Sequence, residues 1–422
     1  MHDPKEPHAP QPAPGPEPAA AAAPAPTPAP AAPAPAPAPP AAPAPTVTLS
    51  GPAAALDALF VRMHEMGASD LHLSCGEKPM VRVDGSLRRL DDQPGLTEQS
   101  LVELLRPATP DDNWAEFERC HDTDFAYEVP GLARFRGNLF RDRKGPGAVF
   151  RIIPSKILTA EQLGLSDKVL ELCQLTKGLV LVTGPTGSGK STTLTAMIDW
   201  INKNRDEHVI TIEDPIEFVH DNVRCLINQR EVGRHTEGFK RALRAALRED
   251  PDIVLVGEMR DLETIAIAIE TAETGHLVFG TLHTTTAVST VDRIIDQFPE
   301  GQQAQVRTML SESLKGVIAQ TLCRKIGGGR VAALEVLIGI PSVANLIREG
   351  KTFQIPSIMQ TGRKYGMVTL NDALLQLVKK KLVEPEEAWR RAVDKIGMIN
   401  MMRGAGIDVS FVPGDREAAA VG

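Results

Sequence analysis

One stretch of eight residues constrains the fold of this chain more than any other. It fits the phosphate-loop pattern G-x-x-x-x-G-K-[ST] at every fixed position, and it consists of Gly184, Pro185, Thr186, Gly187, Ser188, Gly189, Lys190 and Ser191. The apolar run before it, at 178–183, predicts a buried strand, and the apolar spacing after it predicts a helix that begins at the lysine. Backbone N–H groups and the positive end of the helix dipole converge at such a junction, so it binds anions.

The chemistry of this loop is specific for a nucleotide. Lys190 is expected to reach the β- and γ-phosphates of ATP, and the Ser191 hydroxyl is expected to ligate Mg²⁺. Thr192, the next residue, completes the predicted nucleotide-binding set in this part of the chain.

Composition separates the two ends of the chain from the rest. Residues 1–50 are almost entirely Ala and Pro, so they have too few large apolar side chains to offset the entropy of ordering. We predict a disordered, partly polyproline II tail there, without the basic start or continuous apolar run of a signal peptide. A second disordered tail is expected at 396–422.

Charge and cysteine content exclude several classes of protein. The net charge is −8, of which the first 50 residues contribute −2, and this balance argues against a large nucleic-acid footprint. No apolar run approaches the length of a membrane span, so we expect none. The five cysteines are scattered and form no C-x-x-C pair, which disfavours both a disulfide framework and a zinc site. A cytoplasmic protein is therefore predicted.

The order of elements predicts two folded domains. An α+β domain without a nucleotide motif is expected at 51–155, with strands around 71–73, 80–83, 123–128 and 133–140. From 156 to about 395 apolar strands alternate with helices, which indicates an α/β fold with a mostly parallel sheet. From Gln302 onward the pattern becomes mainly helical, and it suggests a helical C-terminal part. Ligands of such a sheet gather at the carboxyl ends of its strands.

Two acidic clusters follow predicted strands and are candidates for catalysis. The first is Glu213-Asp214-Pro215-Ile216-Glu217, and the second is Gly257-Glu258. Hydrolysis requires a carboxylate to orient or deprotonate water, and Mg²⁺ must be held against the phosphate oxygens. Glu258 is favoured for metal or water positioning, and Glu217 is the second candidate, with Glu213 and Asp214 behind it. Each of these acids has an alternative reading as a helix cap or a surface ion pair.

Two histidines belong to the predicted fourth strand of the parallel sheet. His276 and His283 are seven residues apart, and an odd spacing places them on opposite faces of a regular strand. A shared metal is therefore disfavoured. We expect one of them to sense the γ-phosphate and the other to support the site or an interface.

Five arginines crowd toward the end of the first domain. They are either exposed residues of strand faces, or one or two of them approach a nucleotide bound by the second domain. These residues are Arg134, Arg136, Arg141, Arg143 and Arg151.

The order of these motifs resembles that of the secretion ATPases of type II and type IV pilus systems. The sequences ITIEDPIEFVH, ALREDPDIVLVGEMRDLETI and ETGHLVFGTLHTT, at 211–221, 246–265 and 273–285, resemble the pilus retraction ATPases within that superfamily. ASDLHLS at 68–74 and VRVDG at 81–85 extend the resemblance into the first domain. It covers roughly residues 51–390.

The resemblance carries its own expectations for fold and site. It implies a PAS-like N-terminal domain, a RecA-like ATPase domain and a homohexameric ring. It implies that Glu217 is the catalytic base and Glu258 the Walker-B acid, and that arginines of the first domain, Arg134, Arg136 and Arg151, reach nucleotide. Extension ATPases of the superfamily carry a four-cysteine zinc site, so the lack of C-x-x-C favours retraction.

The predicted function is therefore an ATP-hydrolysing motor of the pilus base. It is expected to act on an inner-membrane platform protein, and through it on pilin, from the cytoplasmic side of the membrane. Alternatives are a type II secretion or pilus-assembly ATPase, an accessory retraction ATPase, a RecA-like nucleic-acid motor, and a regulatory nucleotide-binding module without turnover.

One segment departs from the pattern of the retraction ATPases. Those proteins carry Ala-Ile-Arg-Asn-Leu-Ile-Arg-Glu, a segment tied to retraction rather than to hydrolysis, whereas this chain has Ser-Val-Ala-Asn-Leu-Ile-Arg-Glu at 342–349. Helical spacing predicts that Val343, Leu346 and Ile347 pack against the ATPase core. Arg348 and Glu349 are then expected to point away and to meet a partner or a neighbouring subunit.

Overall fold

The computed structural model describes residues 51–83, 85–153 and 157–412 of the chain. The predicted Ala/Pro tail at 1–50 and the last ten residues of the predicted C-terminal tail lie outside these ranges. Within them, no helix combines the length and the hydrophobicity that crossing a bilayer requires.

The first lobe is built on a six-stranded antiparallel sheet with the strand order β3-β2-β1-β6-β5-β4. Its strands are β1 (Asp70–Ser74), β2 (Met80–Val83), β3 (Ser86–Arg89), β4 (Asp122–Val129), β5 (Ala133–Asp142) and β6 (Gly145–Ile153). Its helices are α1 (Ala54–Glu65), α2 (Glu98–Leu105), η1 (Arg106–Ala108) and α3 (Asp111–Cys120). Phe60 of α1 stacks on Phe135 of β5 with ring centroids 4.0 Å apart, and both are fully buried. The helix therefore packs on the sheet through aromatic side chains.

The second lobe contains a seven-stranded sheet with the order β13-β12-β7-β11-β10-β8-β9. All neighbouring strands are parallel except β13, which is antiparallel to β12. The strands are β7 (Gly178–Thr183), β8 (His208–Glu213), β9 (Leu226–Glu231), β10 (Ile253–Val256), β11 (Leu277–Leu282), β12 (Leu314–Arg324) and β13 (Arg330–Ile338). The predicted mixed α/β fold with a mostly parallel sheet is thus confirmed for this lobe.

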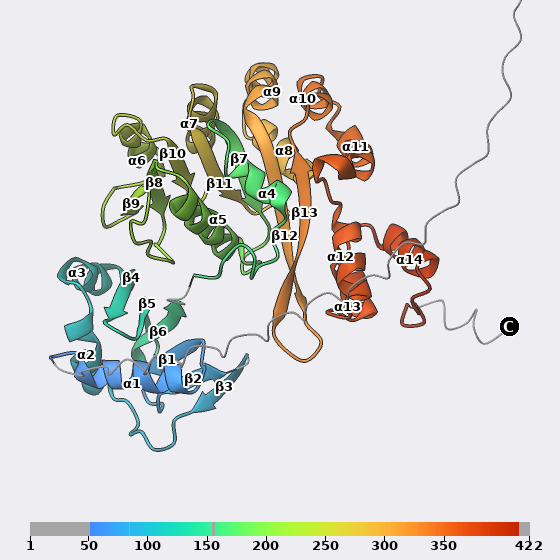
Figure 1. Cartoon of the computed structure of the whole chain (residues 1–422). Coiled ribbons are helices and arrows are strands. Elements are labelled where there is room, and N and C mark those ends of the chain that lie inside the picture. The colour runs from blue at the N-terminus through green and yellow to red at the C-terminus, as the bar shows by residue number, and fades with distance from the viewer. Residues whose placement is uncertain (1–50, 84, 154–156, 413–422) are drawn as a thin grey trace, which may run out of the picture. The chain divides into compact units, whose positions relative to one another are not determined.

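Helices cover both faces of this sheet (Figure 1). They are α4 (Asp167–Leu172), α5 (Lys190–Asn204), α6 (Phe239–Ala246), α7 (Leu262–Glu273), α8 (Ala287–Asp296) and α9 (Glu300–Ser313). Leu179 and Leu181 of β7 face the core under α6 to α9, while Val180 and Val182 face the core under α4 and α5. Successive residues of β7 face the two cores in turn, so both faces of this central strand are buried. This explains the continuous apolar run in its sequence.

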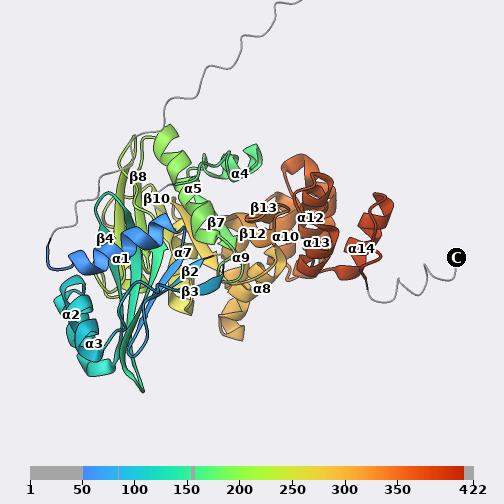
Figure 2. The same cartoon turned by 90° about the horizontal axis from the view of Figure 1, so that it is seen from below.

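Helices also follow the last strand, at the red end of the chain (Figure 2). They are α10 (Pro341–Arg348), η2 (Thr352–Gln354), α11 (Ile355–Thr361), η3 (Gly362–Tyr365), α12 (Leu370–Lys379), α13 (Pro385–Arg391) and α14 (Lys395–Gly404). The disorder predicted from residue 396 is wrong for its first part, because Met398 and Met402 of α14 are fully buried in a core with Cys323 of β12 and Leu374 of α12. Two methionines one helical turn apart anchor one face of α14, while its other faces remain partly or fully exposed.

The expectation of a mainly helical region after Gln302 was also wrong in part. Residues 314–324 form β12, an eleven-residue strand that lies between β7 and β13 in the sheet. The strand β9 was not predicted either, because its sequence LINQRE is largely polar and it lies at the edge of the sheet. An edge strand needs little apolar surface, so hydrophobic periodicity does not reveal it.

A buried carboxylate of β13 joins two helix N-termini. The two oxygens of Glu335 accept hydrogen bonds from the backbone N–H groups of Ala287, 2.7 Å, and Leu370, 3.2 Å, which are the first residues of α8 and α12. Burial raises the pKa of Glu335, while these two hydrogen bonds act in the opposite direction. The N-terminal ends of both helices favour a negative charge at this position.

We expect Glu335→Gln to lower the melting temperature of the protein. An amide has one acceptor oxygen, so one of the two buried N–H groups loses its partner, at a cost of about 1–3 kcal/mol. Thermal unfolding followed by circular dichroism measures the effect. The matched control is Glu171→Gln, because Glu171 is exposed and its partner among the described residues is Lys168, and such surface pairs contribute little. Equal melting temperatures of the two variants would show that Glu335 has no such role.

Candidate functional site

The phosphate loop lies between β7 and α5, as predicted, and the helix begins at Lys190. Gly187 and Gly189 have φ values of 75° and 88°, in the left-handed region that glycine adopts without a steric penalty. A Cβ on Gly184 would lie 2.4 Å from the carbonyl oxygen of Gln320, so a larger residue cannot take its place without moving β12. The glycines of the motif are thus required by conformation and by close packing.

The ammonium group of Lys190 lies inside the loop. Its Nζ donates to the carbonyl oxygens of Gly184, at 2.8 Å, and Pro185, at 3.4 Å. Burial lowers the pKa of Lys190, and the charges of Glu258 and Glu217 oppose that effect. Within the described residues it forms no ion pair with a carboxylate. A buried cation in a ring of backbone groups fits an anionic phosphate.

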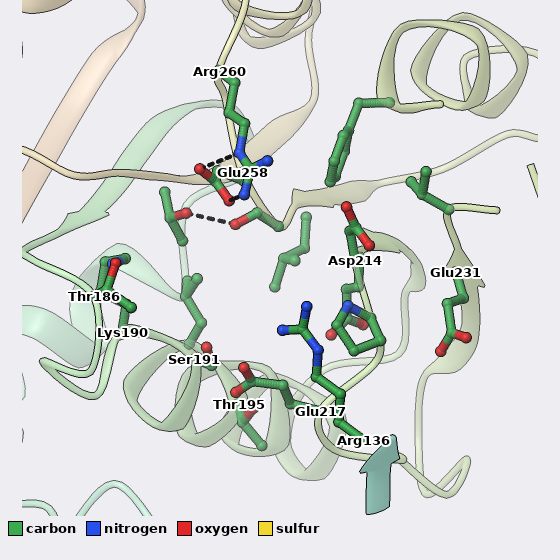
Figure 3. Close-up of a pocket in the computed structure, with 18 of the residues that line it drawn as sticks. Arg136, Thr186, Lys190, Ser191, Thr195, Asp214, Glu217, Glu231, Glu258 and Arg260 are labelled. Carbon is green, nitrogen blue, oxygen red and sulfur yellow. Dashed lines mark hydrogen bonds and ion pairs between the residues drawn. The ribbon is translucent and has the colours of Figure 1, made fainter. Parts of the chain in front are cut away.

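A cavity of about 500 Å³ opens beside this loop. Ser191 and Thr195, four residues apart on α5, line it together with Thr186 and Lys190 (Figure 3). The first two turns of the helix therefore contribute hydroxyl groups and a lysine side chain to the lining of one cavity.

Glu258 lies two residues beyond the end of β10, as the sequence predicted, and it lines the same cavity. Arg260 donates two bonds to its carboxylate, with N–O distances of 2.5 and 2.7 Å (Figure 3). His283 Nε2 lies 2.7 Å from Oε1 of the same carboxylate. Burial alone would raise the pKa of Glu258, but the hydrogen bonds from Arg260 and His283 outweigh it and lower that pKa. The group is therefore held as a carboxylate.

His283 connects the acid to the phosphate-loop lysine. Lys190 Nζ lies 3.4 Å from His283 Nδ1, on the other side of the ring from Glu258. An ammonium group only donates, so Nδ1 accepts and Nε2 carries the proton that is donated to Glu258. The row Lys190–His283–Glu258 thereby joins the first residue of α5 to the residues that follow β11 and β10.

Two carboxylates of the acidic cluster that begins at the end of β8 differ in burial and in hydrogen bonding. Glu213 is the last residue of β8, and it accepts from Thr211 Oγ1, at 2.6 Å, and Gln229 Nε2, at 3.1 Å. Burial raises the pKa of Glu213. Glu217 also lines the cavity, and its carboxylate forms no hydrogen bond or ion pair in the part of the chain that the structure describes. Glu217 is therefore free to bind a water molecule or a ligand.

The resemblance implied that Arg134, Arg136 and Arg151 reach nucleotide. Of these three arginines, only Arg136 lines the cavity (Figure 3). Arg134 instead forms an ion pair with Glu231, at 3.1 Å, and Glu231 is the residue that lines the cavity there. Arg151 binds Asp70, at 2.8 Å, within the first lobe. All three belong to one face of the sheet, on β5 or β6, and the carboxylate that each side chain pairs with separates them.

His276 does not belong to this site. It precedes β11, whereas His283 follows that strand, and its Nδ1 lies 3.2 Å from the carbonyl oxygen of Thr271. A six-residue strand rises about 3.3 Å per residue, so the two histidines lie at opposite ends of the sheet. The prediction asked which face of the strand each histidine occupies. What separates the two histidines is that they lie at opposite ends of the strand, and only His283 lies at the end beside the cavity. Thr192, on α5, does not line the cavity either.

Several cavity residues were not singled out from the sequence. Thr195 follows Ser191 by one helical turn, and Arg260 follows Glu258 by two residues, so a search around the predicted residues would have found both. Thr281 is a third such residue, and its hydroxyl donates to the carbonyl oxygen of Gly257 at 2.5 Å. No local pattern distinguishes it from other buried threonines.

The segment at 342–349 lies on α10, away from the cavity. Val343, Leu346 and Ile347 are buried, as predicted. Arg348 forms an ion pair with Glu312 of α9, at 3.8 Å, and Glu349 forms one with Lys351, at 2.8 Å. Both side chains are half exposed to solvent.

The sequence of the chain matches a family of known proteins. The model of the family described as "Type II/IV secretion system protein" matches residues 52–386. Over 328 residues, which are 78% of this chain and 95% of the relative, the chain is 57% identical to the type IV pilus retraction ATPase PilT of Pseudomonas aeruginosa. Over 321 residues, 76% of this chain and 86% of the relative, it is 51% identical to a twitching motility protein of Neisseria gonorrhoeae.

A solved structure has the same fold. The crystal structure of the pilus retraction motor PilT with bound ADP superposes with a TM-score of 0.77 at 48% sequence identity. The superposition covers 81% of this chain and 98% of that protein.

Proposed function

Because the chain belongs to the type II/IV secretion system protein family and is an ATP hydrolase, we propose that it is a motor that retracts type IV pili. The observation that carries the proposal is the connected row Lys190–His283–Glu258 at a phosphate loop, with the carboxylate of Glu217, which has no partner among the described residues, in the same cavity. A loop that only bound a nucleotide would not require two acids at the ends of neighbouring strands.

The residues present fit ATP and Mg²⁺. The buried ammonium group of Lys190 and the backbone of the phosphate loop suit the phosphate chain. The Ser191 hydroxyl and the Glu258 carboxylate are oxygen donors of the type that Mg²⁺ prefers, and they line one cavity. When bound, the ion neutralises charge on the phosphate oxygens.

The two acids have different roles in this proposal. Glu258 is held ionised by Arg260 and His283, which suits a group that faces the metal-bound phosphates. Glu217 has no such partners, so it is available to orient the attacking water and take its proton. His283 lies between Glu258 and Lys190, where a change in phosphate charge alters both of its contacts.

We further propose a homohexameric ring with a PAS-like first domain and a RecA-like second domain. In this ring Arg136, which lines the cavity and pairs there with Asp124 at 3.6 Å, exchanges that carboxylate for phosphate oxygens. An added cation beside the γ-phosphate stabilises charge in the transition state. The ring would act on an inner-membrane platform protein at the pilus base, from its cytoplasmic side, and on pilin indirectly. Identity to retraction proteins over most of the chain supports this assignment.

Live imaging of labelled pili in a deletion strain of the source bacterium tests the assignment. A retraction motor predicts cells that carry pili which extend and never shorten. Cells without pili would instead indicate an assembly ATPase, and normal pilus dynamics with a secretion defect would indicate a type II secretion ATPase. A modest loss of retraction force would fit an accessory motor, and stimulation of the purified ATPase by DNA or RNA would indicate a nucleic-acid motor.

We expect Arg348→Ala to reduce retraction while most ATPase activity remains. Arg348 lies on α10 outside the cavity and is half exposed, so it touches no group that acts on nucleotide. ATPase rate of the purified variant and retraction speed in cells measure the two effects. Glu312→Ala is the matched control, because it breaks the same ion pair and keeps the arginine. Normal retraction by Arg348→Ala would remove this segment from the mechanism.

A further inference from the structure

A buried amide lies directly behind the phosphate loop. Gln320 lies on β12, next to β7 in the sheet, and it is 3% exposed. In the register of the two strands Ala319 pairs with Thr183, so Gln320 lies beside the point at which β7 ends and the loop begins. It comes from a part of the chain more than a hundred residues beyond the loop.

Both ends of the Gln320 amide bind the loop and its helix. Nε2 donates to the carbonyl oxygen of Ser188 at 2.7 Å, and Oε1 accepts from Thr193 Oγ1 at 2.6 Å. The backbone carbonyl of Ser188 only accepts, so the orientation of the amide is determined by its partners. One side chain therefore joins the last part of the loop to the first turn of α5.

Two glycines of the motif make room for this residue. A Cβ on Gly189 would lie 2.8 Å from Gln320 Nε2, and a Cβ on Gly184 would lie 2.4 Å from the Gln320 carbonyl oxygen. Gln320 thus fills the space directly behind the loop, on the side of β12.

The hydrogen bond to Ser188 has a consequence for the loop backbone. A trans peptide holds its C=O and N–H in opposite directions. When Gln320 holds the Ser188 carbonyl toward β12, the N–H of Gly189 points away from β12. A phosphate loop binds its ligand through backbone N–H groups of this kind.

We propose that Gln320 is a positioning residue for nucleotide binding, which sets the direction of the Gly189 N–H by holding the Ser188 carbonyl. The proposal rests on the proposed function, because it assumes that the loop binds the phosphates of a nucleotide. Gln320 touches no ligand itself. Its effect is on the affinity of the loop for phosphates rather than on the folding of the sheet.

Titration of the fluorescent nucleotide N-methylanthraniloyl-ADP, with Mg²⁺ present, tests the proposal on the full chain. Gln320→Glu keeps the acceptor for Thr193 but replaces the donor with a carboxylate oxygen, which repels the Ser188 carbonyl. We expect its dissociation constant to rise about tenfold or more, because a buried hydrogen bond is lost and replaced by repulsion. Gln320→Met, a neutral side chain of similar length, is the second variant and should weaken binding in the same direction.

Two control variants separate an effect on the direction of the loop backbone from an effect on side-chain packing. Thr193→Val removes only the contact to α5, so it should weaken binding less than Gln320→Glu. Thr321→Val changes the next residue of β12, whose side chain lies on the opposite face of the strand, and should leave binding unchanged. Melting temperatures without nucleotide should fall further in Gln320→Met than in Thr193→Val, because Gln320→Met removes both hydrogen bonds of the amide and Thr193→Val removes one.

Three outcomes decide between the proposals. Weakened binding in both Gln320 variants, with the Thr321→Val affinity unchanged, supports the positioning role. Wild-type affinity in either folded Gln320 variant, while Lys190→Ala binds poorly, overturns it and leaves the proposed function intact. Absence of nucleotide binding by the wild-type protein would instead overturn the proposed function.

Discussion

Purified protein carrying Lys190→Ala should hydrolyse no ATP above background and should bind nucleotide more weakly. Lys190 is the cation inside the phosphate loop, and its Nζ contacts two loop carbonyls and His283. Alanine removes the charge that faces the β- and γ-phosphates and also the group that connects the loop to His283 and Glu258. Steady-state phosphate release, together with titration of a fluorescent ADP analogue, measures both effects.

The chain offers a matched control on the same helix. Lys203 is half exposed near the end of α5, where it pairs with Asp199 four residues earlier. Lys203→Ala removes the same charge from the protein and leaves the loop untouched, so its ATPase rate should equal that of the wild type. Turnover by Lys190→Ala at the wild-type rate would mean that this loop is not the site of hydrolysis.

Glu217→Gln and Glu258→Gln should each bind ATP and hydrolyse it about a hundredfold more slowly, or slower still. For Glu217 the reason is the loss of a carboxylate that can accept a proton from water. For Glu258 the reason is the loss of a carboxylate whose pKa is lowered by Arg260 and His283 against the effect of burial. Binding should persist because Lys190 and the loop backbone are unchanged in both variants.

Single-turnover hydrolysis with enzyme in excess separates chemistry from product release in these variants. Glu263→Gln is the control, since Glu263 is exposed on α7 and pairs with Lys240 outside the cavity. If both Glu217→Gln and Glu258→Gln hydrolysed ATP at the wild-type rate, the roles assigned to the two acids would be wrong. If only Glu217→Gln did so, the base would have to be sought among the other carboxylates of the cavity.

Much of this site is encoded in short stretches of sequence. The loop and the start of α5 follow from glycine and lysine spacing, and Glu258 follows from an apolar run that ends just before it. These inferences succeed because a parallel sheet gathers the carboxyl ends of its strands at one edge, whatever the order of those strands. The N-cap of α7 is equally local, because the side chain of Asp261, directly before the helix, accepts from the Thr264 N–H.

The remaining features depend on contacts between distant parts of the chain. Gln320 reaches the phosphate loop from a strand 132 positions later than Ser188, and nothing in its neighbourhood marks it as different from other strand residues. Arg134 and Arg136 lie two positions apart on β5, yet only Arg136 lines the cavity, because Arg134 is bound by Glu231. Sequence patterns predict which residues lie on strands. The packing of distant parts of the chain determines which partner each side chain contacts.

Pilus length followed over time, in cells whose only retraction ATPase carries Glu217→Gln, tests the central claim most directly. The claim is that ATP hydrolysis at this cavity drives retraction. We predict that these cells extend pili that do not shorten, while cells complemented with the wild-type gene at equal protein level retract theirs. Shortening of pili at the wild-type rate in the Glu217→Gln cells would contradict the claim.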